Sequence, residues 1–144
     1  MLRALIVDDD PVNSRFLEEI LSPYAACDTA ACGRDGLDAF GRALAAGRPY
    51  DLILLDVMMP GMDGHQALEG MRDLEHRQGV SSSDAAKVIM ISALDDTKTM
   101  YRAFFQGQAL SFLTKPFTCD TVLGELRKFD LIDNPAHPSA RSDA

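Results

Sequence analysis

The sequence predicts an α/β domain in which helices cover both faces of a parallel sheet. Residues 52–55 and, after Lys87, residues 88–91 are apolar runs without polar alternation, and residues 2–7 form a third run that only Arg3 interrupts. Continuous apolar runs of this kind are typical of strands whose two faces are both covered. Segments with helical spacing alternate with the strands five times, through short connections. This alternation favours parallel strands joined by right-handed crossovers.

The first predicted strand, residues 2–7, is followed by three acids, Asp8, Asp9 and Asp10. Pro11 suits the first turn of a helix, and Asp10 is interpreted as the N-cap of that helix. Apolar residues then recur at helical spacing until Pro23, namely Val12, Phe16, Leu17, Ile20 and Leu21. Asp10 therefore has a structural explanation, whereas Asp8 and Asp9 have none.

The other elements are predicted in the same way from periodicity and from Gly and Pro breaks. They are a weak strand at 26–31, a helix at 33–46 that stops at Gly47, a strand at 52–55, a helix at 65–77, a serine-rich loop at 79–86, a strand at 87–91, a helix at 95–106, a strand at 111–114 and a helix at 118–129. We expect one folded domain over residues 1–129 and a loose Pro- and Ser-rich tail over residues 130–144.

Composition limits the classes of function. The chain has 144 residues, 47% of them hydrophobic, and a formal net charge of -8. This charge argues against nucleic acid or an anionic membrane as a direct partner. We find neither a leader nor an apolar run long enough to span a membrane, and we therefore expect a cytoplasmic protein. The three cysteines lack metal-ligand spacing and are interpreted as reduced thiols.

The carboxyl ends of parallel strands lie at one edge of a sheet, where ligands of open α/β sheets bind. Five residues are expected to converge there: Asp8, Asp9, Asp56, Ser92 and Lys115. Three carboxylates so close together repel one another, and a hard divalent cation would resolve this repulsion. Mg²⁺, for which Mn²⁺ can substitute, prefers such oxygen ligands and leaves positions for a phosphoryl group.

The same residues suit phosphoryl transfer. A metal-bound and ionised Asp56 is a usable nucleophile, and carboxylates accept phosphoryl groups in other proteins. Lys115 can place a positive charge and Ser92 a hydroxyl against the phosphoryl oxygens. The expected product is an acyl phosphate on Asp56.

Four segments carry a family resemblance. They are Leu-Ile-Val-Asp-Asp-Asp-Pro at 5–11, Asp-Leu-Ile-Leu-Leu-Asp-Val-Met-Met-Pro-Gly-Met-Asp-Gly at 51–64, Val-Ile-Met-Ile-Ser-Ala at 88–93 and Phe-Leu-Thr-Lys-Pro-Phe at 112–117. Together they resemble the receiver domain of bacterial two-component response regulators, over about residues 2–129. One mild departure is Gln108-Ala109, where the family often has Gly-Ala.

The resemblance implies a flavodoxin-like (βα)5 fold with five helices and a five-stranded parallel sheet in the order 2-1-3-4-5. It also implies a cis bond before Pro116. By the same resemblance Asp56 is the phosphoacceptor, Asp8 and Asp9 hold Mg²⁺ together with Asp56 and the backbone carbonyl of Met58, and Lys115 contacts the phosphoryl group.

The resemblance also implies how the signal leaves the site. Ser92 would move toward the phosphoryl group, and the ring of Phe112 would turn into the space that Ser92 leaves. The surface formed by residues 95–106, 111–114 and 118–129 would then change, and a downstream protein would read that change.

We therefore expect a stand-alone, chemotaxis-regulator-like receiver that a histidine kinase or a His-phosphotransfer protein phosphorylates. It would catalyse only its own phosphorylation and slow dephosphorylation. A phosphate carrier within a phosphorelay remains an alternative, as does a degenerate receiver that is never phosphorylated. An Asp-nucleophile phosphatase is a weaker alternative because Met58 stands where such enzymes place their general acid/base. A dinucleotide-binding module lacks its Gly-rich turn.

Overall fold

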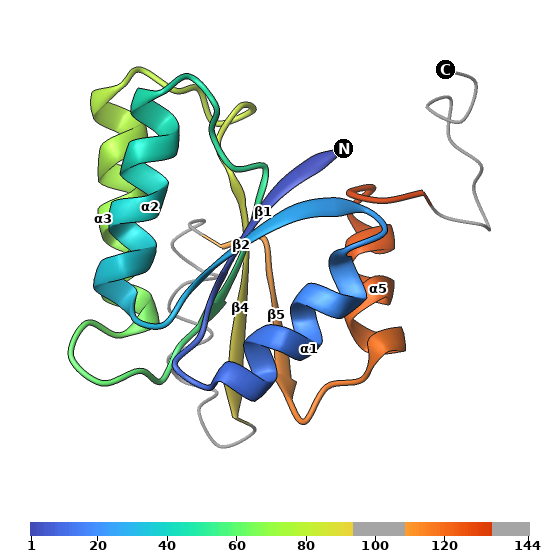
Figure 1. Cartoon of the computed structure of the whole chain (residues 1–144). Helices are drawn as coiled ribbons and strands as arrows, with labels where there is room; N and C mark the ends of the chain where they lie inside the picture. Colours follow the sequence, from blue (N-terminus) through green and yellow to red (C-terminus); the bar gives the residue numbers. More distant parts are fainter. Residues whose placement is uncertain (94–108, 134–144) are drawn as a thin grey trace.

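The computed structural model describes residues 1–93 and 109–133 (Figure 1). The strands of this part are β1 (Leu2–Val7), β2 (Ala25–Ala30), β3 (Leu52–Asp56), β4 (Lys87–Ala93) and β5 (Ser111–Lys115). Its helices are α1 (Pro11–Leu21), α2 (Gly33–Ala45), α3 (Gly64–Arg77) and α5 (Cys119–Lys128). The predicted helix at 95–106 and the departure at Gln108 lie outside the described residues.

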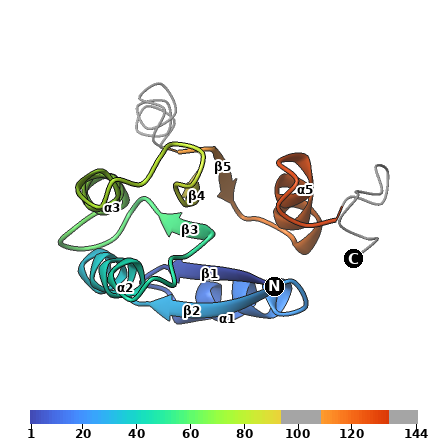
Figure 2. The same ribbon diagram turned by 90° about the horizontal axis from the view of Figure 1, so that it is seen from above.

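The strands form one five-stranded sheet in the order β2-β1-β3-β4-β5, and every neighbouring pair is parallel. This confirms the predicted fold class and strand order. The Lys115–Pro116 peptide bond is cis, as the family resemblance implies. Seen from above, the strands follow one another across the molecule in this order (Figure 2).

The helices divide between the two faces of the sheet, with α2 and α3 on one side and α1 and α5 on the other (Figure 1). The central strands alternate accordingly. In β3, Ile53 and Leu55 pack toward α2 and α3, whereas Leu52 and Leu54 pack toward α1 and α5. All four side chains are fully buried, which explains why this strand has no polar position.

Short polar side chains begin the helices. Asp10 caps α1 by accepting a hydrogen bond from the Val12 N–H at 2.9 Å, which confirms the predicted N-cap. Asp63 and Gln66 form a capping box at the start of α3, and Thr118 caps α5. After the C-terminal end of α2, Gly47 has a φ of 74°, the left-handed conformation that ends many helices.

The packed core continues to the end of the described residues. The Leu131 N–H donates to the Leu126 carbonyl at 2.8 Å, and Ile132 is buried against the cluster between the sheet, α1 and α5. The three cysteines are free thiols. In the two described segments no helix has the length and apolar character needed to cross a membrane.

Candidate functional site

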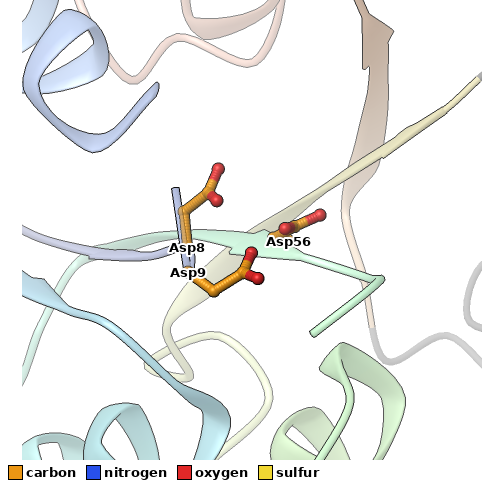
Figure 3. Close-up of side chains that lie close together, drawn as sticks. All are labelled: Asp8, Asp9 and Asp56. Atoms are coloured by element: carbon orange, nitrogen blue, oxygen red, sulfur yellow. The ribbon is translucent and has the colours of Figure 1, made fainter. Parts of the chain in front are cut away.

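The acids that follow β1 and end β3 meet at the carboxyl edge of the sheet. Val7 pairs with Leu55 in the β1–β3 ladder, so the residues that come next, Asp8 and Asp56, are neighbours. Asp8, Asp9 and Asp56 each contribute one carboxylate oxygen to a group whose members all lie within 4.8 Å of one another. Figure 3 shows these side chains gathered at the ends of the two strands.

Lys115 joins this group from the far side of β4. It is the last residue of β5, and β4 separates β5 from β3 in the sheet. Its side chain nevertheless reaches across the end of β4, so that its Nζ lies 3.3 Å from Oδ1 of Asp56 and 3.8 Å from Oδ2 of Asp8. The structure therefore brings a cation to both buried carboxylates.

Ser92 and Phe112 share the face of the sheet that α2 and α3 cover. Ser92 is fully buried in β4, and its hydroxyl donates to the Ala93 carbonyl at 3.3 Å. Ser92 pairs with Thr114 in the β4–β5 ladder, and Phe112 lies two residues before Thr114. Residues two apart point to the same face of a strand, so Phe112 is a diagonal neighbour of Ser92. The ring of Phe112 is half-buried and packs against the core cluster on this face.

Burial and mutual repulsion raise the pKa values of Asp8 and Asp56. Asp8 and Asp56 are each only 2% exposed, whereas Asp9 is exposed. Burial, followed by the charge of Asp8, raises the pKa of Asp56 to about 6, and Lys115 partly offsets the rise. Burial likewise raises the pKa of Asp8, although the Asp10 N–H and Lys115 oppose this rise. The site therefore holds its negative charge at a cost in free energy.

The donor set fits a hard divalent cation. Three carboxylates against one lysine leave an excess of negative charge, and the ligand atoms are all oxygens, which suits Mg²⁺, Ca²⁺ or Mn²⁺ better than a soft metal. Oδ2 of Asp8 is buried and accepts no hydrogen bond within the described segments. Lys115 Nζ, 3.8 Å away, compensates this atom only in part, and a closer cation would satisfy it. The residues present therefore fit a magnesium ion.

Two backbone contributions were not foreseen from the sequence. The Asp10 N–H donates to Oδ1 of Asp8 at 2.9 Å, so the residue interpreted as a helix cap also orients an acid of the site. Gly64 begins α3 against the backbone of the acceptor strand, where a Cβ atom would collide with the Asp56 carbonyl and lie 2.8 Å from Cα of Val57. The available signal in the sequence was a glycine directly before the helix predicted at 65–77.

Comparison with known proteins places this geometry in a family. The profile of the response regulator receiver domain matches residues 4–127. The chain is 34% identical over 123 residues to the chemotaxis protein CheY of Treponema pallidum (strain Nichols), covering 84% of this chain and 77% of that protein. It is 30% identical over 131 residues to the two-component response regulator ORR41 of Oryza sativa subsp. japonica, covering 91% of this chain and 96% of that protein.

Solved structures that resemble this fold support the same family assignment. The CheX–CheY–BeF3–Mg²⁺ complex of Borrelia burgdorferi matches with a TM-score of 0.73 and 26% identity, over 90% of this chain and 89% of that chain. The chemotaxis protein CheY4 of Vibrio cholerae matches with a TM-score of 0.69 and 25% identity, over 89% of this chain and 98% of that chain.

Some relatives are longer. The chain is 31% identical over 128 residues to the transcriptional regulatory protein PcoR of Escherichia coli, covering 88% of this chain but only 50% of PcoR. The match to the protein-glutamate methylesterase of Myxococcus xanthus (strain DK1622) covers 33% of that protein. The chain thus belongs to the response regulator receiver domain family, the phosphorylation-dependent signalling switches of two-component systems.

Proposed function

We propose that Asp56 is the residue of this receiver that accepts the phosphoryl group, from a histidine kinase or a His-phosphotransfer protein. The observation that carries the proposal is the pairing of a buried Asp56 carboxylate with Lys115 Nζ at 3.3 Å, inside a group of three acids. An open hollow of about 510 Å³ lies beside Asp8 and Asp9, between α1 and the end of β2. Asp8 and Asp9 are part of its lining.

In the proposed reaction, a carboxylate oxygen of Asp56 attacks the phosphorus of a phosphohistidine. The bond from phosphorus to the imidazole nitrogen breaks, and the nitrogen keeps the electron pair and takes up a proton. Lys115 is positioned to bind a phosphoryl oxygen and so to stabilise the charge that develops during transfer. The product is an acyl phosphate on Asp56.

Receivers bind Mg²⁺ at an acidic pocket, and the three acids fit that ion. We assign Asp8, Asp9 and Asp56 as its carboxylate ligands and the backbone carbonyl of Met58 as a further ligand, with Mn²⁺ as a substitute. Bound there, the ion would neutralise the acids and supply positive charge near the phosphoryl group. Met58 is tied to the acceptor because its N–H donates to Oδ1 of Asp56 at 3.4 Å.

We assign Ser92 and Phe112 as the switch pair. Their diagonal placement on one face of the sheet lets a displacement of the Ser92 hydroxyl open space beside the half-buried ring. The face that includes β5 and α5 would then present a changed surface to a downstream protein. We assign no role in nucleic-acid or membrane binding, in keeping with a formal net charge of -8. We propose that the protein acts in the cytoplasm.

We propose no reaction on a separate substrate. The chain would catalyse only its own phosphorylation and a slow hydrolysis of the acyl phosphate. For the domain boundary, we propose that residues 1–129 carry the switch and that residues 130–144 are not needed for phosphorylation.

The direct test is incubation with acetyl phosphate and Mg²⁺, followed by intact-mass analysis. The wild-type chain should gain one phosphoryl group, and Asp56→Asn should gain none. Asp38→Asn, which changes an exposed acid on α2, is the matched control and should react as the wild type does. Phosphorylation of Asp56→Asn to the wild-type extent would exclude Asp56 as the acceptor.

A further inference from the structure

We propose that a second, arginine-lined site binds the phosphate group of a small molecule at the edge of the sheet opposite Asp56. The site is a hollow of about 340 Å³ whose polar lining consists of Arg3, Asp28, Arg42, Arg48 and Tyr50. Arg3 lies near the start of β1 and Tyr50 precedes β3, whereas the three acids of the acceptor site lie at the other ends of these strands. The two sites are therefore separate.

The charge of the hollow is opposite to that of the whole chain. Three guanidinium groups and one carboxylate line it, although the chain has 22 acidic residues against 14 lysines and arginines. The cations are all arginines, whose planar guanidinium groups bind phosphate oxygens through two parallel hydrogen bonds. A phosphate group is thus the chemical class that these side chains suit.

The carboxylate in the lining does not satisfy the arginines. The Tyr50 hydroxyl donates to Oδ2 of Asp28 at 2.6 Å, so this oxygen already has a short hydrogen bond. Nη2 of Arg3 forms a long ion pair with the same oxygen at 4.0 Å, which is beyond hydrogen-bond distance. Nη1 of Arg3 is buried and donates to no acceptor in the parts of the chain that the structure describes. A buried donor without an acceptor costs free energy, which an acceptor brought to it would recover.

Surrounding groups hold two of the arginines in place. The Arg3 guanidinium carbon lies 4.9 Å from the centroid of the buried Tyr50 ring, in a cation–π contact that orients the group. At the end of α2, the Arg48 N–H donates to the Ala43 carbonyl at 3.0 Å, and Gly47 takes the left-handed conformation. This helix-ending turn brings Arg48 back over the hollow.

Arg42 has a second explanation, because a cation in the last turn of α2 also interacts favourably with the helix dipole. The dipole does not explain Arg3, which lies on a strand, or the hydrogen-bond donor that Arg3 leaves unused. The C-terminal carbonyls of α2 oppose an anion, so the proposed affinity depends on all three arginines together. Removing two of them should therefore abolish most of the binding.

The test uses the full chain in EDTA, so that no divalent metal can draw phosphate to the acids. Inorganic phosphate is titrated against the ¹⁵N-labelled protein at constant ionic strength, with sodium chloride as the balancing salt. We expect saturable shifts of the backbone amide signals of Arg3, Arg42, Arg48 and Tyr50, and a higher melting temperature than in chloride alone. A parallel titration with glucose 6-phosphate tests whether the bound phosphate group belongs to free phosphate or to a phosphate ester. Tighter binding of glucose 6-phosphate than of inorganic phosphate assigns a phosphate ester as the ligand. Weaker binding assigns free phosphate.

Variants of the arginines test whether phosphate binds at this hollow. The double variant Arg42→Ala, Arg48→Ala should lower the apparent affinity at least tenfold, whereas Arg34→Ala, an exposed arginine at the other end of α2, should leave it unchanged. Arg3→Lys keeps the charge but not the two-pronged geometry, and it should weaken binding less than the double variant does. Asp56→Asn should bind phosphate as the wild type does, so this test is independent of the acceptor assignment.

Two results would overturn the proposal. One is a phosphate titration that shifts signals and melting temperature no more than chloride does. The other is a double variant that keeps the full wild-type response.

Discussion

At the scale of single residues, the ionisation of Asp56 is the most informative property of the acceptor site. Its pKa is raised to about 6 because the carboxyl is buried beside a second buried acid. The folded chain therefore binds this proton more tightly than the unfolded chain does. For an acid with a raised pKa, the free energy of unfolding is largest at low pH and falls as pH rises from the unfolded value toward the folded one.

This predicts how stability responds to pH without metal. Between about pH 4 and pH 7 in EDTA, the free energy of unfolding of the wild type should fall by on the order of 1–3 kcal/mol through Asp56 alone. Asp56→Asn should fall by less and be the more stable form near pH 7. Urea unfolding at a series of pH values measures both curves. Parallel curves for the two proteins would contradict the raised pKa.

Lys115 is predicted to act on the rate of phosphorylation. Lys115→Ala removes the cation 3.3 Å from Asp56, and the loss of a preorganised charge of this kind slows group transfer by about 10²-fold. Stopped reactions with acetyl phosphate, analysed by intact mass over time, measure the rate. Lys128→Ala, an exposed lysine on α5, is the matched control. A rate for Lys115→Ala within twofold of wild type would remove Lys115 from the mechanism.

Met58 is predicted to set the lifetime of the acyl phosphate. Its thioether side chain is 65% exposed two residues after Asp56 and cannot orient an attacking water by accepting a proton. The wild-type acyl phosphate should therefore persist for many minutes, and Met58→Glu should shorten its lifetime about tenfold or more. Loss of the added mass after removal of acetyl phosphate follows this decay. A wild-type lifetime of seconds would contradict the prediction.

At the scale of secondary-structure elements, the start of α3 holds the acceptor strand in place. Gly64 packs so closely that a Cβ atom would collide with the Asp56 carbonyl, and its N–H donates to the Val57 carbonyl at 2.9 Å. The loop between Asp56 and α3 therefore depends on a residue without a side chain. This loop contains Met58, which we assign as a metal ligand through its carbonyl.

Gly64→Ala should accordingly damage both fold and site. We expect a loss of about 1–3 kcal/mol in the free energy of unfolding, from the backbone shift that the extra atom forces, together with weaker Mg²⁺ binding. Gly124→Ala is the matched control, since a Cβ at Gly124 in α5 meets nothing within 4 Å. That variant should gain about 0.5–1 kcal/mol from better helix propensity. Thermal unfolding measures the stability of the two variants, and calorimetric Mg²⁺ titration measures their affinity for the ion. Equal stability and equal Mg²⁺ affinity of the two variants would refute the role of Gly64.

At the scale of the whole molecule, the acceptor site is assembled from three strands that are far apart in the chain. Asp8 and Asp9 follow β1, Asp56 ends β3 and Lys115 ends β5, so the site exists only while the sheet is intact. A cation that binds this group binds the folded chain and not the unfolded one. Binding and folding are therefore linked.

This linkage predicts that Mg²⁺ stabilises the protein. At a concentration 100 times the dissociation constant, the ion should add about 2.7 kcal/mol to the free energy of unfolding, and EDTA should reverse the effect. Asp8→Asn and Asp56→Asn should each lose most of the gain, whereas Asp38→Asn should keep it. Melting curves with and without Mg²⁺ measure the difference. An equal rise in melting temperature for all four proteins would argue against the acids as ligands.

Most of this architecture could be predicted from the order of residues. The buried strands are continuous apolar runs because both their faces are covered, and the helices follow their caps and periodicity. The sequence pattern of a strand was weaker at β2, because an edge strand with exposed positions has no continuous apolar run. This strand was predicted at 26–31 and is observed at Ala25–Ala30. β4 continues to Ala93, two residues beyond the predicted end, because Ser92 pairs with Thr114 although a buried polar residue resembles the end of a strand.

The sequence by itself determined the elements, the acids at the strand ends and, through four ordered motifs, the family. Only the tertiary structure decided which of these groups meet and at what distance, because each depends on register and crossovers that no local pattern encodes. Lys115 reaches Asp56 across β4, Gly64 contacts the acceptor backbone, and Arg3 lines one hollow together with Arg42 and Arg48. Periodicity shows which side chains point away from the core, whereas the contacts between them depend on how the strands are arranged in the folded sheet.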